Sequence, residues 1–208
     1  MAEKFGKIED SGERRGFSTG AKRDVDGDKP RYDLIPVTVL QRVVRCHDRF
    51  DVSDIVSKEI SDKLKARMMS IGYAWGAAPL DDLLLEIIWI CLKVIEFQED
   101  DKVLSVDPKL FCGFHVISPK THTRIANHYG GGAKKYDSWN WSKGMPHSVF
   151  HASLMRHIFK VIDDATNEDH WSALFFNAAA ILHFKMVGRV DMDDITPRLE
   201  EWGTYETS

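Results

Sequence analysis

The feature that most constrains the fold is a pair of helical segments near the C-terminus, residues 147–163 and 167–187, separated by only a few residues. Both segments repeat an i, i+4, i+7 spacing on one helix face. The residues with this spacing are His157, Val161 and Asp164 in and directly after the first segment, and His170, Leu174 and Asn177 in the second. Because so short a connection leaves room only for a turn, the two segments are expected to form an antiparallel helical hairpin.

Helical spacing also dominates the rest of the chain, and strand signals are scarce. Further helices are predicted over residues 37–45, within residues 51–97 with a break near Gly72, Gly76 and Pro79, and over residues 122–129. The fold class is therefore mainly α, a helical bundle with an irregular N-terminal arm and a loop rich in Gly, Lys and Trp. An irregular turn is expected at Gly130–Gly132. Residues 1–30 are predicted to be a flexible or extended arm, and residues 31–208 a single helical domain.

The composition allows one sizeable core and argues against several classes of protein. The chain has 208 residues, of which 43% are hydrophobic. Its 28 basic and 32 acidic residues give a net charge of -4, whereas a general nucleic-acid binder needs a clustered basic face. The most apolar stretch, residues 83–97, is interrupted by charged residues, so no membrane span is expected. Three cysteines without a CxxC pair suit free thiols in the cytoplasm.

The turn of the predicted hairpin concentrates side chains that can bind a metal ion. Five potential ligands fall within eight residues, namely Asp163, Asp164, Glu168, Asp169 and His170. Carboxylates suit Mg²⁺ or Mn²⁺, and the expected ligands are Asp164, Glu168 and Asp169. The alternative is that these acids cap the second helix and complement its dipole, which is the commoner role of such a cluster.

A second group of residues combines glycines, cations and aromatic rings. It consists of Gly132, Lys134, Lys135, Tyr136, Trp139, Asn140 and Trp141. Glycines let the backbone approach a phosphate, lysines supply positive charge, and aromatic rings stack on a base. No Walker pattern is present. The mixture suits a nucleotide pocket, and a structural loop with surface lysines explains the same composition.

A third segment, residues 29–36, is stiffened by two prolines and carries Arg31 as its only strongly directional cation. It can contribute a charge to a site or serve as a plain extended connector.

Together these motifs resemble the dATP/dGTP diphosphohydrolase family, which is often found in phage genomes. The resemblance rests on Thr19–Asp24, Lys29–Pro36, Gly132–Tyr136, Asn140, Trp141, Gly144, Arg156, His157, Glu168–His170 and Asn177. It implies release of pyrophosphate from dGTP or dATP, with Mg²⁺ or Mn²⁺ as cofactor. It also implies an architecture akin to the all-α MazG-like pyrophosphohydrolases.

This chain departs from the family pattern in two places. Residues 46–123 intervene between motifs that related sequences bring close together, so an insertion is expected there. Asp163 and Asp164 also stand where the family commonly has Gly-Glu. The shorter aspartate keeps the charge but reduces the reach toward a metal ion.

The resemblance and the residue chemistry assign provisional roles. The expected catalytic residues are His157, Asp164, Asp169 and His170, and the expected substrate-binding residues are Arg31, Lys134, Lys135, Tyr136, Asn140, Trp141, Arg156 and Asn177. Two other functions stay open: triphosphate release, as by histidine-aspartate phosphohydrolases, and nucleotide binding without catalysis. A homo-oligomer is expected because apolar helices can pair across a two-fold axis. If the chain is encoded by a phage, it is expected in the host cytoplasm.

Overall fold

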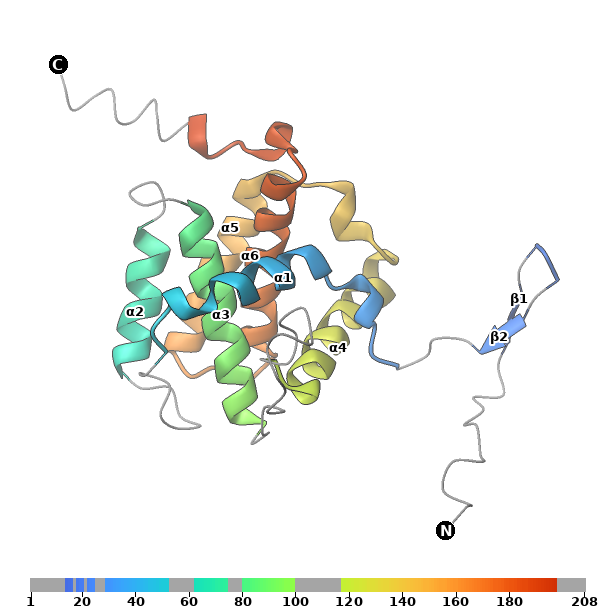
Figure 1. The fold of residues 1–208 in the computed structure, drawn as a ribbon, viewed down its shortest axis with the longest axis horizontal. Helices are drawn as coiled ribbons and strands as arrows, with labels where there is room; N and C mark the ends of the chain where they lie inside the picture. The colour runs from blue at the N-terminus through green and yellow to red at the C-terminus, as the bar shows by residue number, and fades with distance from the viewer. Residues whose placement is uncertain are drawn as a thin grey trace, which may run out of the picture.

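The computed structural model describes residues 14–16, 18–20, 22–24, 29–52, 62–74, 80–99 and 117–197, and the fold of these residues is mainly helical, as predicted. The α-helices are α1 (Val37–Cys46), α2 (Asp62–Tyr73), α3 (Leu80–Gln98), α4 (Pro119–Tyr136), α5 (His147–Ile162) and α6 (His170–Met186). Short 3-10 helices cover Tyr32–Leu34, His47–Arg49, Asn140–Lys143 and Val190–Met192. The strands β1 (Arg14–Gly16) and β2 (Lys22–Asp24) form an antiparallel pair that stands apart from the helices (Figure 1).

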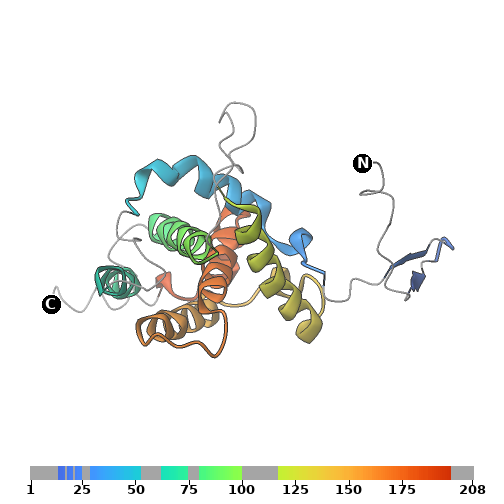
Figure 2. The same cartoon turned by 90° about the horizontal axis from the view of Figure 1, so that it is seen from below.

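Helix α6 occupies the centre of the bundle, between α3 and α5 (Figure 1). Its apolar side chains point in all directions, which is typical of a helix surrounded by protein. Leu174, Phe175 and Ile181 are completely buried, and so are Ile87 and Ile88 of α3. Helix α1 covers one side of the α3–α6 pair and α5 covers the other (Figure 2). The core therefore surrounds α6.

The starts of α4 and α6 are specified by capping residues. Ser118 accepts a hydrogen bond from the backbone N–H of Thr121 at 3.1 Å, and Pro119 follows as the first helical residue. Asp169 caps α6 by accepting from the backbone N–H of Ser172 at 3.2 Å. The capping role proposed for the acidic cluster is thus correct for Asp169.

The irregular turn expected at Gly130–Gly132 is wrong, because these glycines lie inside α4. Helix α4 continues to Tyr136 and also contains Lys134 and Lys135, so the loop begins only at Asp137. Glycine weakens a helix by about 1 kcal/mol relative to alanine, but packing can override that preference. Tyr129 and Gly130 are buried, and the backbone N–H of Arg31 donates to the carbonyl of Ala126 at 3.3 Å.

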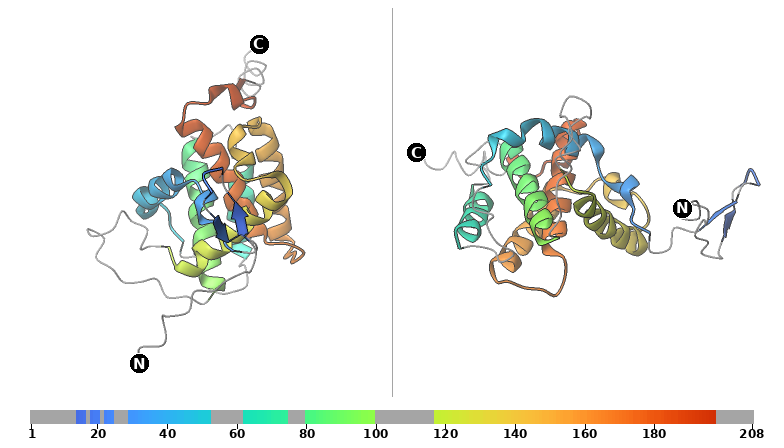
Figure 3. Two further views of the ribbon diagram at one scale, coloured as in Figure 1. Left: turned by 90° about the vertical axis from the view of Figure 1, so that its right-hand side faces the viewer. Right: turned by 60° about the horizontal axis from the view of Figure 1, so that its bottom comes forward.

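The antiparallel hairpin of α5 and α6 forms as predicted, but its turn differs in detail. Helix α5 ends at Ile162, and Asp164 adopts a left-handed conformation with a φ of 52°. Asp164 therefore does not share a helix face with His157. Its carboxylate lies 2.5 Å from the Nζ atom of Lys65, which comes from α2. Helix α2 packs along α5 at the outer edge of the bundle (Figure 3).

Part of the segment expected as an insertion belongs to the bundle itself, since α3 packs against α6. The cap expected at residues 53–54 and most of the apolar run 110–117 lie outside the described residues. Among the residues that the structure describes, no helix combines the length and apolarity that a membrane span requires.

Candidate functional site

A pocket of about 1050 Å³ opens between α4, the 137–146 loop, α5 and α6. Helix α4 contributes its C-terminal half and α5 its first turns. The connection between α5 and α6 closes one end with Glu168 and Asp169. A second pocket of about 730 Å³ lies on the other side of these two acids and is lined by Lys65, Arg124 and His170. The turn between α5 and α6 therefore separates two hollows of the surface.

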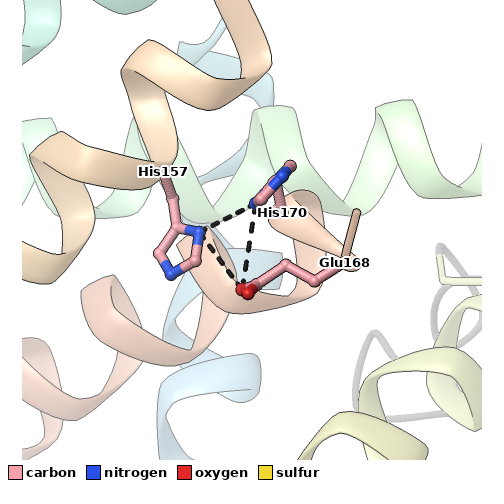
Figure 4. Close-up of side chains that lie close together, drawn as sticks. All are labelled: His157, Glu168 and His170. Atoms are coloured by element: carbon pink, nitrogen blue, oxygen red, sulfur yellow. Dashed lines mark hydrogen bonds and ion pairs between the residues drawn. The ribbon is translucent and has the colours of Figure 1, made fainter. Parts of the chain in front are cut away.

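Three side chains converge at this turn, and Figure 4 shows them pointing toward one another. The Nδ1 atoms of His157 and His170 are 3.0 Å apart. The Oε1 atom of Glu168 lies 3.5 Å from the Nδ1 atom of His157 and 3.8 Å from that of His170. Both histidines are buried, whereas Glu168 is half exposed at the pocket wall. One side chain from the end of α5, one from the turn and one from the start of α6 thus form a triangle.

The dimensions of this triangle fit a metal ion. Two ligand atoms that are each about 2.1 Å from an ion lie roughly 3.0 Å apart at a right angle and roughly 3.4 Å apart at the tetrahedral angle. The observed separations of 3.0, 3.5 and 3.8 Å are close to this range. Among the described residues, His157, Glu168 and His170 form the group with spacing suited to a metal ion. The residues present therefore fit a divalent cation.

The burial of His157 and the hydrogen bonding of His170 also suit metal ligands. Burial lowers the pKa of His157, while the nearby charge of Glu168 opposes this effect. The Nε2 atom of His170 lies 3.2 Å from the side-chain oxygen of Asn167, to which an Nε2–H group can donate a hydrogen bond. With its proton on Nε2, the His170 ring has a lone pair on Nδ1, and this lone pair is directed into the triangle. Neutral imidazoles are the form that binds a metal ion.

Asp169, expected to be a metal ligand and a catalytic residue, has structural partners instead. Both of its carboxylate oxygens accept hydrogen bonds at 2.8 Å from Arg124 of α4. Burial alone would raise the pKa of Asp169, but the hydrogen bonds from Arg124 and Ser172 hold it below its ordinary value. Asp169 thus joins α4 to the start of α6. Asp164 points to Lys65, so the structure brings together Glu168 but not Asp164 or Asp169 with the histidine pair.

The expected cations divide into those that line the large pocket and those that do not. Lys135 and Arg156 line it, and the Nη2 atom of Arg156 donates to the Ser153 hydroxyl at 3.0 Å. Lys134 is exposed on α4 and is not among the lining residues. Arg31 also lies outside the lining. Its guanidinium donates to both carboxylate oxygens of Asp33 and, at 3.1 Å, to the hydroxyl of Ser138.

The aromatic rings of the pocket have different accessibilities. Tyr136 and Trp139 are exposed at 54% and 44%, and both line the pocket. Trp141 is buried, with its ring centroid 5.1 Å from that of His183 and 6.1 Å from that of Tyr129. Trp141 therefore forms part of the wall. The Nζ atom of Lys135 lies 4.8 Å from the ring centroid of Tyr136, and the Trp139 ring is tilted beside Trp141 at 6.3 Å, so Trp139 is the exposed ring without a cation over it that could stack on a base.

Two asparagines add polar groups to the lining of the pocket. Asn177 is buried on α6, and its amide group donates to the carbonyl of Ala173 at 2.7 Å, so its side-chain oxygen remains to accept a hydrogen bond. Asn140 lies in the loop, where its oxygen accepts from Lys143 at 3.3 Å. Both line the pocket, as expected for substrate-binding residues.

Sequence reasoning missed His128, which lines the pocket from α4. Burial lowers the pKa of His128, and the charges of Asp169 and Glu168 act against this effect. The residue therefore lies near the acidic turn. The available signal was its i, i+4 spacing from Arg124, since the two side chains project from the same face of α4 toward α6.

A helical bundle that holds potential metal ligands at one end of an aromatic and cationic pocket has the residue types that bind a phosphorylated, aromatic ligand. In a comparison with protein families, residues 107–195 match the family model described as dATP/dGTP diphosphohydrolase, N-terminal. This match confirms the family resemblance over that part of the chain, which includes α4, α5 and α6. No curated protein and no solved structure matches the chain significantly.

Proposed function

We propose that the protein hydrolyses a purine deoxynucleoside triphosphate to the monophosphate and pyrophosphate with the help of a divalent metal ion. The observation that carries this proposal is the triangle of His157, Glu168 and His170 beside the large pocket. The family match to dATP/dGTP diphosphohydrolases supports both the reaction class and the purine substrate.

The three side chains would hold the ion through two imidazole nitrogens and one carboxylate oxygen. Mg²⁺ binds mainly through oxygen and water, whereas imidazole suits transition metals. Of the two ions expected from the sequence, this mixed set favours Mn²⁺. When bound, such an ion neutralises phosphate oxygens and lowers the pKa of an attacking water.

The remaining residues of the pocket would bind and orient the nucleotide. Arg156 and Lys135 supply positive charge against the triphosphate, and a guanidinium can engage two phosphate oxygens at once. Trp139 offers a ring face for the base, and Tyr136 lies beside it with Lys135 over its ring. Asn177 presents its side-chain oxygen to a hydroxyl donor of the substrate.

In the proposed reaction a water oxygen forms a bond to the α-phosphorus, and the bond from that phosphorus to the oxygen bridging to the β-phosphorus breaks. The leaving group is pyrophosphate, and the proton released by the water passes to solvent. The monophosphate then carries the oxygen of the attacking water.

The direct test is to incubate the pure protein with each dNTP and Mn²⁺ or Mg²⁺ and to identify the products by mass spectrometry. We expect dNMP and pyrophosphate from dGTP or dATP, with loss of turnover when the metal is chelated. Tripolyphosphate with nucleoside would instead indicate triphosphohydrolase activity. Tight binding of an unchanged nucleotide would indicate a binder without catalysis. A homo-oligomeric state and a role in a phage-infected cytoplasm stay predictions.

A further inference from the structure

The turn that follows α4 has an unusual backbone. Asp137 has φ 78° and ψ 156°, and Trp139 has φ 63° and ψ 14°. The first of these conformations is close to a region that is essentially restricted to glycine. Asp137 also places a negative charge at the C-terminal end of a helix, where the helix dipole favours cations. Residues that break such local preferences are expected where a side chain contacts a ligand.

The carboxylate of Asp137 differs from the other two acids that line the large pocket. Asp169 is bound by Arg124, and Glu168 faces the two histidines. For Asp137, by contrast, no ion pair or side-chain hydrogen bond of the carboxylate is found among the described residues. The turn itself is held by Arg31, which donates to Ser138. The pocket therefore presents one available carboxylate on a fixed turn.

Asp137 lines the pocket at the C-terminal end of α4, and the rise of this helix separates Asp137 from the acids of the α5–α6 turn. His128, which is close to the acids of the α5–α6 turn, precedes Asp137 by nine positions, and nine helical positions span roughly 13 Å. This separation suits a nucleotide whose phosphates lie at the triangle and whose base lies at the 137–139 turn. The exposed ring of Trp139 is then beside the base.

We propose that Asp137 binds the Watson–Crick edge of guanine and makes the pocket selective for guanine over adenine nucleotides. This inference rests on the proposed function, since it assigns the base of the same substrate. Guanine offers its N1–H and its N2 amino group side by side, and one carboxylate can accept from both. Adenine presents a lone pair at N1, which a carboxylate repels. Trp139 supplies the stacking face.

The test measures binding of dGMP, dIMP and dAMP by calorimetry in the presence of a metal chelator, so it does not depend on catalysis. The wild-type protein is expected to bind dGMP at least about tenfold more tightly than dAMP, because hydrogen bonds to a charged group are strong. Binding of dIMP should be intermediate, since dIMP lacks the amino group. In Asp137→Asn the side chain has one donor and one acceptor, which match adenine, so the preference should fall or reverse.

A second variant separates base recognition from structure. Asp137→Gly removes the carboxylate and relieves the positive φ, so it should raise the melting temperature while it abolishes the preference for dGMP. Asp163→Asn, an exposed acid outside the pocket, serves as the control and should leave the ratio unchanged.

Equal affinities for dGMP and dAMP in the wild type, no binding of any of the three, or an unchanged ratio in both Asp137 variants would overturn the assignment. Turnover of dGTP and dATP at equal rates would leave the proposed hydrolysis intact and remove only the guanine preference. A clear preference for dGMP without turnover of any dNTP would support the guanine contact of Asp137 and contradict the proposed hydrolysis.

Discussion

The arginines near the pocket differ in whether a carboxylate binds their guanidinium group. Arg31 is bound by Asp33, and Arg124 is bound by Asp169 and Glu99. Within the described residues, the guanidinium of Arg156 contacts no carboxylate, and its Nη2 atom donates only to the Ser153 hydroxyl. Arg156 is therefore the pocket cation that is most available to a phosphate.

The substitution Arg156→Ala should raise KM for dGTP or dATP by about tenfold or more, because a charge-assisted hydrogen bond to phosphate is lost. Steady-state kinetics in the presence of Mn²⁺ would measure the change. Lys160→Ala is the matched control, since Lys160 lies one turn further along α5 and does not line the pocket. Equal KM values for wild type and Arg156→Ala would exclude a phosphate contact.

The elements of the fold differ in how well the sequence specifies them. Helix α5 follows from helical spacing, and α3 and α6 follow from long apolar segments; Ser118 and Asp169 provide the caps that begin α4 and α6. The extension of α4 through Gly130–Gly132 was not predictable from local preference, because burial of Tyr129 and the contact with residue 31 stabilise it. The end of α5 at Ile162 was also not predicted, and because of it Asp164 does not share a helix face with His157.

The candidate site was predictable in part for the same reasons. Histidines 157 and 170 were expected near the acidic turn because the hairpin could be inferred from sequence. The choice of Glu168 over Asp164 and Asp169 depends on contacts with Lys65 and Arg124, which come from α2 and α4. Those long-range ion pairs have no local signature in the sequence.

The helical state of the glycine segment can be tested by Gly132→Ala. An added Cβ at Gly132 meets nothing within 4 Å, so the substitution should stabilise the protein by about 0.5–1 kcal/mol. Gly188→Ala is the matched control. Its Cβ also meets nothing, but its φ of +73° should make the change destabilising. Urea denaturation measures both, and destabilisation by Gly132→Ala would contradict the helical assignment.

For the whole molecule, the stability of the helical bundle should depend on pH through its buried histidines. Burial lowers the pKa of His147, His151 and His183 below the ordinary value of 6.5. As the pH falls below about 6.5, the unfolded chain therefore takes up protons before the folded protein does. The free energy of unfolding should decrease below that pH and should not depend on these groups well above it.

Urea denaturation at pH 7.5 and pH 5.5, with a metal chelator present throughout, would check this dependence. We expect lower stability at the acidic pH, and a weaker dependence in His147→Gln, because that ring is almost completely buried. Equal or greater stability of the wild type at pH 5.5 would show that the buried histidines do not determine the response.

The central claim is that the side chains at the α5–α6 turn hold the metal ion that supports hydrolysis. The most direct measurement is the Mn²⁺ concentration that gives half-maximal release of pyrophosphate from dGTP or dATP. Glu168→Gln should raise this concentration at least about tenfold, since it removes the charged ligand of the triangle. Asp163→Asn, which alters the charge in the same turn, should not change it. An unchanged Mn²⁺ requirement in Glu168→Gln would contradict the account.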